Sequence, residues 1–159
     1  MTAATVLAGV APDRRAYGLI VLATDLAESS EPATAEAFRL AGQLGASMLI
    51  VHVIDPGALR RVPGHGPALH QVRATRESAM TVLVARGREH GLQVSFLIWE
   101  GDPGEAIIEA ATAEGADLIV IGNRGHSGVG RALIGSVSDE VVRNAGCPVL
   151  VVRRSGRAD

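Results

Sequence analysis

The residues of this 159-residue chain best suited to chemistry are glycines spaced to surround a phosphate group. Gly122 and Gly125 are followed, after nine intervening residues, by the pair Gly135-Ser136. Glycine lets the backbone approach a ligand closely, and a helix beginning at Ser136 would point its free N–H groups and positive dipole end at an anion. The apolar run 117–121 directly before the loop has the composition of a buried strand. This order of strand, glycine loop and helix predicts a phosphate site.

The composition removes several enzyme classes from consideration. All 15 basic residues are arginines, so the chain has no lysine for a Walker A motif, a Schiff base or a kinase-type phosphate contact. Its one cysteine, Cys147, excludes an internal disulfide and a cysteine-based zinc cluster. Cys147 has no histidine and asparagine at a recognisable spacing, so we interpret it as a buried structural thiol. His126, in the glycine loop, has no evident acid partner, and we predict no catalytic residue.

Charge and hydropathy predict a cytoplasmic protein that binds neither membranes nor nucleic acid. No apolar run approaches the roughly 18 to 20 residues that a membrane-spanning helix needs. The N-terminus has no basic residue before its short apolar stretch 5–10, so it lacks the pattern of a secretory signal. A formal net charge of −2 gives little attraction to a phosphate backbone, and four aromatic residues offer few surfaces for stacking bases.

Five apolar runs predict β-strands that are buried on both faces. Their apolar residues stand at consecutive positions, which is typical of a parallel sheet covered by helices. The runs are Gly18–Ala23, Ser47–Val53, Gln93–Ile98, Asp117–Ile121 and Pro148–Val152. Four helices are predicted between them, over residues 30–45, 67–90, 102–115 and 136–146, from glycine, proline and capping signals.

The alternation of strands and helices predicts an α/β fold with a single doubly wound sheet of five parallel strands, Rossmann-like, with four main helices. In such sheets the ligand binds beyond the carboxyl ends of the strands, where the strand order reverses. If the first and fourth strands are neighbours there, Thr24 and Asp25 face the glycine loop. The segment 55–66 is too rich in glycine and proline for a regular element, and we expect it to cross the mouth of the site.

With these motifs in place, the chain resembles a universal stress protein of the ATP-binding type, whose signature is G-x2-G-x9-G-[ST]. Gly122, Gly125, Gly135 and Ser136 satisfy the signature without a gap. The resemblance covers residues 18–153 and predicts a universal stress protein domain over residues 17–154, between a flexible N-terminal tail (1–16) and a C-terminal tail (155–159). It implies the sheet order 3-2-1-4-5, with ATP in the crevice between the first and fourth strands.

The resemblance also implies which residues contact ATP. The glycine-loop positions and the start of the last helix contact the phosphates, mostly through backbone N–H groups. Asp25 matches the acidic residue near the ribose and phosphates, and Val53 matches the position whose backbone hydrogen-bonds adenine. We add Arg124 as a candidate phosphate contact, because one guanidinium group can donate two parallel hydrogen bonds to phosphate oxygens. The complete set is Thr24, Asp25, Val53, Gly122, Arg124, Gly125, Gly135, Ser136, Val137 and Ser138.

Asp25 is also the candidate metal ligand. A carboxylate opposite a polyphosphate is repelled unless it holds a ribose hydroxyl or a bridging cation, and Mg²⁺ prefers oxygen ligands of this kind. Many members of the family have Asp-Gly-Ser at this point, whereas this chain has Asp25-Leu26-Ala27. A glycine and one hydroxyl contact are therefore missing from the loop after the first strand.

Two classes of function remain open. The first is an ATP-binding regulatory module of a stress response, a homodimer through its fifth strand, in which the nucleotide acts as a switch. The second is an enzyme that hydrolyses ATP slowly in the same crevice. We favour the module, because the sequence places no lysine, no activated water and no second carboxylate near the phosphates. A flavin site is weaker still, because the loops after the strands lack the aromatic residues expected around an isoalloxazine.

Overall fold

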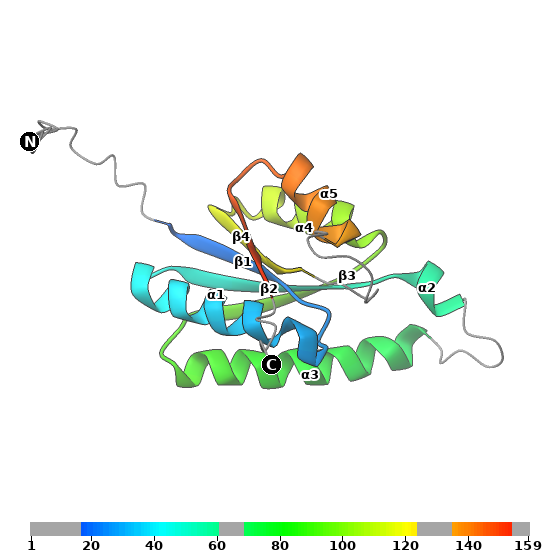
Figure 1. The fold of residues 1–159 in the computed structure, drawn as a ribbon. Coiled ribbons are helices and arrows are strands. Elements are labelled where there is room, and N and C mark those ends of the chain that lie inside the picture. Colours follow the sequence, from blue (N-terminus) through cyan, green and yellow to red (C-terminus); the bar gives the residue numbers. More distant parts are fainter. Residues whose placement is uncertain (1–16, 61–68, 124–134, 154–159) are drawn as a thin grey trace, which may run out of the picture.

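A single parallel sheet forms the centre of the structure, a computed structural model that describes residues 17–60, 69–123 and 135–153 (Figure 1). The strands lie in the order β3-β2-β1-β4-β5. They are β1 (Leu19–Ala23), β2 (Ser47–Ile54), β3 (Val94–Glu100), β4 (Leu118–Gly122) and β5 (Val149–Val152). The predicted α/β fold and strand order are confirmed, and each strand begins and ends close to the limits of its apolar run.

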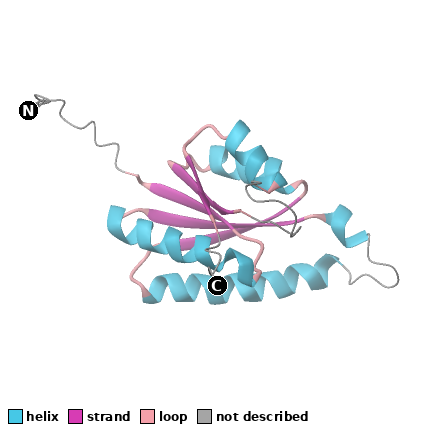
Figure 2. Cartoon of the chain, viewed as in Figure 1, coloured by secondary structure: helices cyan, strands magenta, loops and turns pink. Residues whose placement is uncertain are grey.

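Helices cover both faces of the sheet (Figure 2). α1 (Glu31–Leu44) and α3 (Leu69–Glu89) pack against one face, and α4 (Pro103–Ala113) and α5 (Ser136–Asn144) pack against the other. A 3-10 turn, η1 (Glu28–Ser30), leads into α1. Among the helices that the structure describes, none is long and apolar enough to cross a membrane.

Strand alternation divides the hydrophobic core into two layers. In β2, Ile50 and Ile54 face α1 and α3, whereas Leu49 and Val51 face α4 and α5. Successive side chains of a strand point to opposite faces, so a strand covered on both sides must be apolar at every position. This requirement explains the consecutive apolar runs in the sequence. The same alternation decides on which side of the sheet each side chain of the cleft lies.

Local capping signals set the ends of the helices. The Asp102 carboxylate accepts hydrogen bonds from the N–H groups of Gly104 and Glu105, at 3.1 and 3.2 Å. These bonds satisfy two of the donors that the first turn of α4 leaves unpaired. α1 ends at Gly45, whose φ of 66° lies in the left-handed region that favours glycine.

Part of the segment predicted to be irregular is helical. α2 (Pro56–Arg60) begins after a single residue, Asp55, that separates it from β2, so the prediction for residues 55–66 is wrong at its beginning. Asp55 Oδ1 accepts a hydrogen bond from the Gly57 N–H at 2.7 Å, and the fixed φ of Pro56 suits the first turn of a helix. Residues 61–66 of the segment lie outside the described residues.

Cys147 is less buried than predicted. Its side chain is half-buried between α5 and β5, and not enclosed in the core. Partial burial, assisted by the negative charge of Asp117, raises the pKa of the thiol above its ordinary value. A thiol held in its protonated form is a poor nucleophile, in keeping with a structural role.

Candidate functional site

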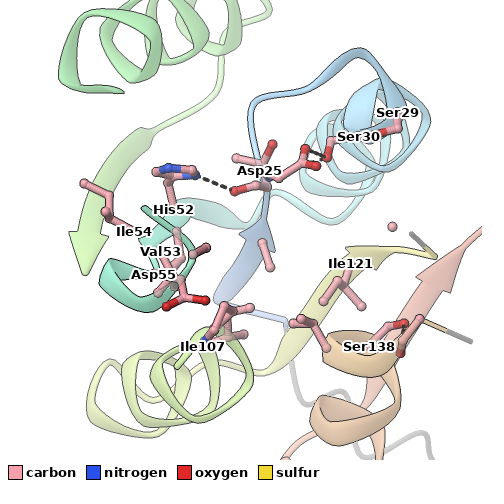
Figure 3. Close-up of a pocket in the computed structure, with 18 of the residues that line it drawn as sticks. Asp25, Ser29, Ser30, His52, Val53, Ile54, Asp55, Ile107, Ile121 and Ser138 are labelled. Atoms are coloured by element: carbon pink, nitrogen blue, oxygen red, sulfur yellow. Dashed lines mark hydrogen bonds between the residues drawn. The ribbon is translucent and has the colours of Figure 1, made fainter. Parts of the chain in front are cut away.

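A cleft of about 520 Å³ opens at the carboxyl ends of the strands, around the point between β1 and β4 where the strand order reverses (Figure 3). Its walls come from β1, β2 and β4 and from the helices on both faces of the sheet. Eight of the predicted site residues line it together: Thr24, Asp25, Val53, Gly122, Gly135, Ser136, Val137 and Ser138. The other two, Arg124 and Gly125, lie outside the described residues, as does His126.

The beginning of α5 supplies hydrogen-bond donors to one end of the cleft. The first intrahelical bond runs from the Asp139 N–H to the Gly135 carbonyl at 2.8 Å, so the three N–H groups before it belong to the unpaired first turn. No side chain caps them within the described residues, because Gly135 is the N-cap residue. The Ser138 hydroxyl donates to the Gly135 carbonyl at 2.9 Å, so its proton is used within the helix. The backbone can therefore receive an anion here.

The loop after β1 holds Asp25 in a defined orientation. Asp25 Oδ1 accepts hydrogen bonds from the Ala27 N–H, at 2.8 Å, and from the Ser30 hydroxyl of η1. The Thr24 hydroxyl accepts a bond from the Leu26 N–H at 3.0 Å. Leu26 has a φ of 64°, which places a non-glycine residue in the left-handed region. Glycine adopts this conformation without strain, so the chain forms the turn with a less suitable residue.

β2 extends beyond the end of β1 and leaves a peptide edge open to the cleft. The last pair of the β1–β2 ladder is Ala23 with Val51, followed by a bond from the Thr24 N–H to the Val51 carbonyl at 3.0 Å. Val51 and Val53 direct both their N–H and their C=O toward β1, because alternate residues of a strand face the same neighbour. No described residue bonds to either group of Val53. One donor and one acceptor are thus presented side by side.

His52 precedes Val53 in β2, and its side chain points to the face of the sheet that α1 and α3 cover. Its side chain is 5% exposed, and its Nδ1 atom is 2.9 Å from the carbonyl oxygen of Thr24 (Figure 3). A carbonyl only accepts, so Nδ1 must carry the proton. Burial, the largest effect, lowers the pKa of His52, the Thr24 bond opposes this, and the positive charge of Arg76 lowers it further. His52 is therefore neutral at pH 7, and the prediction of a core or rim residue agrees with its burial.

The sequence patterns do not predict several other residues that line the cleft. Ile107 and Pro103 of α4 form an apolar wall, and Asp55 follows β2 as Asp25 follows β1. The end of a strand is therefore a signal that could have identified Asp55. Arg76 of α3 also lines the cleft. It is half-buried and makes no hydrogen bond or ion pair with the residues that the structure describes. No local pattern distinguishes it from the other arginines of the same helix.

Comparison of the sequence with known families and proteins gives a consistent result. A model of the Universal stress protein family matches residues 16–153. The chain is 38% identical over 148 residues to a universal stress protein of Thermus aquaticus. The alignment covers 86% of this chain and 99% of the relative. It is 32% identical over 141 residues to universal stress protein MJ0531 of Methanocaldococcus jannaschii, covering 87% of this chain and 83% of the relative.

Solved structures show the same architecture. Protein MJ0577 of Methanocaldococcus jannaschii superposes with a TM-score of 0.74 at 27% identity, over 89% of this chain and 99% of that chain. A universal stress protein solved in complex with cAMP superposes with a TM-score of 0.68 at 28% identity, over 87% of this chain and 98% of that chain. From its sequence and its fold, this chain belongs to the universal stress protein family.

Proposed function

We propose that the protein binds ATP in the cleft and acts as a nucleotide-dependent regulatory module of a stress response. The observation that carries this proposal is the pairing of two recognition surfaces within one cleft. The open peptide edge of Val53 lies on one side, and the first turn of α5 lies on the other. A nucleotide has complementary chemistry at its two ends.

The Val53 edge suits adenine. The N–H and C=O of one residue offer a donor and an acceptor in a row, and the Watson–Crick edge of adenine offers an acceptor at N1 and a donor at the exocyclic amine. Val51 and Ile107 supply apolar surface beside this edge. The complex of a related universal stress protein with cAMP supports an adenine nucleotide as the ligand.

The start of α5 suits the phosphates. Ser136, Val137 and Ser138 present backbone N–H groups at the positive end of the helix dipole, and Gly122 lines the same cleft. Asp25 lines the same cleft and would supply a carboxylate to Mg²⁺, which binds through one or two carboxylates together with substrate phosphates. The ion would offset the repulsion between Asp25 and a triphosphate.

Ser136 allows the phosphate contact to be tested without disturbing the fold. Proline is tolerated at the first position of a helix, and Gly135 already has the extended conformation (φ −61°, ψ 158°) that must precede a proline. Ser136→Pro removes one phosphate-facing N–H, whereas Ser136→Ala removes only the hydroxyl. In titration calorimetry with ATP we expect Ser136→Pro to bind roughly ten- to a hundredfold more weakly than Ser136→Ala, the effect of one hydrogen bond to a charged group. Equal affinity of the two variants would place the phosphates elsewhere.

A measurement of turnover separates the module from a slow ATP-hydrolysing enzyme. Typical enzymes turn over about 1 to 1000 times per second, and kinases reach such rates with a lysine, two metal ions and an aspartate base. The chain has no lysine. Phosphate release under saturating Mg-ATP should therefore fall orders of magnitude below that range. Fast release that is lost in Asp25→Asn would instead identify an enzyme.

A further inference from the structure

We propose that His52 is a positioning residue that keeps the peptide edge of Val53 open for the base of the nucleotide. The effect of His52 on nucleotide binding rests on the proposed function. Its effect on the Val53 N–H rests only on the hydrogen bonds around Thr24. In a parallel ladder, a residue that donates to one position of its neighbour accepts from the position two residues further on. Thr24 donates to Val51, so the natural donor to the Thr24 carbonyl is the N–H of Val53.

His52 takes this carbonyl instead. Its Nδ1–H donates to the Thr24 oxygen at 2.9 Å, and no bond joins that oxygen to the Val53 N–H. Because His52 lies at an even position of β2, its ring approaches from the face of the sheet that α1 and α3 cover. An acceptor drawn toward that face leaves the plane in which the N–H of Val53 points. The ladder between β1 and β2 therefore stops one bond early.

The bond from His52 gives the Thr24 carbonyl a partner and leaves the Val53 N–H without one among the described residues. The Thr24 carbonyl is buried with its residue, which is 8% exposed, and it needs a partner. His52 provides this partner from the core side, so the Val53 N–H remains for a ligand in the cleft. In this way a core histidine opens the base-recognition edge, and no contact between His52 and the nucleotide is required.

Two variants separate the role of this donor from that of the side-chain volume. Asn carries an amide N–H close to the position of Nδ1, so His52→Asn should preserve the bond to Thr24. His52→Leu fills the space without a donor, and the Thr24 carbonyl should then accept from the Val53 N–H. If His52→Leu does not fold, His52→Gln replaces it, because its amide reaches the position of Nε2 and not that of Nδ1.

The first readout is amide hydrogen exchange of the ligand-free protein by NMR. In the parent and in His52→Asn, the Val53 amide should exchange rapidly beside a protected Val51 amide. In His52→Leu or His52→Gln, the exchange of Val53 should slow by roughly five- to tenfold, the factor that one added hydrogen bond supplies. An unchanged Val53 exchange rate in these variants overturns the inference, whether or not the protein binds ATP.

The second readout is the affinity for ATP in titration calorimetry. We expect His52→Leu to bind roughly five- to tenfold more weakly than the parent, and His52→Asn to recover most of the loss. Equal affinity of His52→Leu and the parent would also overturn the inference. A parent protein that binds no ATP would refute the proposed function instead, and the exchange of Val53 would still decide the role of His52.

Discussion

Leu26 occupies a backbone conformation that leucine rarely adopts. Its φ of 64° lies in the left-handed region, where a side chain is strained by roughly 1 to 3 kcal/mol. Its side chain packs against the core layer beneath α1 and α3, which offsets part of this strain. The turn it forms aims Asp25 at Ser30 and keeps the loop at the edge of the cleft. The chain thus forms with leucine a turn that glycine would form without this strain.

A side chain branched at its β-carbon should destabilise the protein when it stands at position 26. Leu26→Ile conserves volume but adds a β-branch, which is strongly disfavoured at positive φ, whereas Leu26→Met conserves volume without a branch. We expect Leu26→Ile to lower the free energy of unfolding by about 1 kcal/mol more than Leu26→Met, measured from urea denaturation curves. Identical midpoints for the two variants would mean that residue 26 does not have a positive φ in solution.

The contact between α3 and β3 depends on a glycine within a helix. A β-carbon at Gly87 would lie 2.7 Å from Val94 Cγ2 and 3.4 Å from Phe38 Cζ. Val94 is itself buried and fixed in the sheet, so it has little freedom to move away. In α1, by contrast, a β-carbon at Gly42 would meet only Leu92 Cδ2, at an ordinary 3.8 Å. Close packing therefore requires glycine at position 87, whereas position 42 has room for a side chain.

Alanine substitutions should reveal this difference. Gly42→Ala should stabilise the protein by roughly 0.5 to 1 kcal/mol, because alanine is the better helix former and the space is available. Gly87→Ala gains the same propensity but forces overpacking that costs about 1 to 3 kcal/mol, so we expect a net destabilisation of about 1 kcal/mol. Thermal unfolding followed by circular dichroism would check both. Stabilisation of similar size in both variants would contradict the close packing of α3 on β3.

The elements were predictable from the sequence because their signals are local. The consecutive apolar positions of β1 and the caps at Asp102 and Gly45 each act within a few residues, and the structure places them as expected. α2 was missed because its glycine and proline also favour turns, and the bond from Gly57 to Asp55 decides between the two outcomes. Which arginine of α3 reaches the cleft depends on how that helix lies on the sheet, so Arg76 carries no local signal.

At the scale of the whole molecule, the sheet has two edges of different character. β3 ends at Glu100, which forms an ion pair with Arg73 of α3 at 2.8 Å, and charges at an edge oppose pairing with a second sheet. β5 consists of four apolar residues, Val149–Val152, all of them half-buried. β5 is therefore the edge better suited to pair with a second copy of the chain across a two-fold axis.

Val151 offers a direct test of a homodimer through β5. Val152 accepts from the N–H of Asn123, so even positions of β5 face β4, and the N–H of Val151 faces outward. Val151→Pro removes this outward donor without breaking the β4–β5 ladder, because proline is tolerated at the open side of an edge strand. Val151→Thr keeps both the donor and the branched shape. We expect light scattering to show monomers for Val151→Pro and dimers for Val151→Thr and the parent. A dimer that persists in Val151→Pro would place the interface on another surface, with β3 as the next edge to examine.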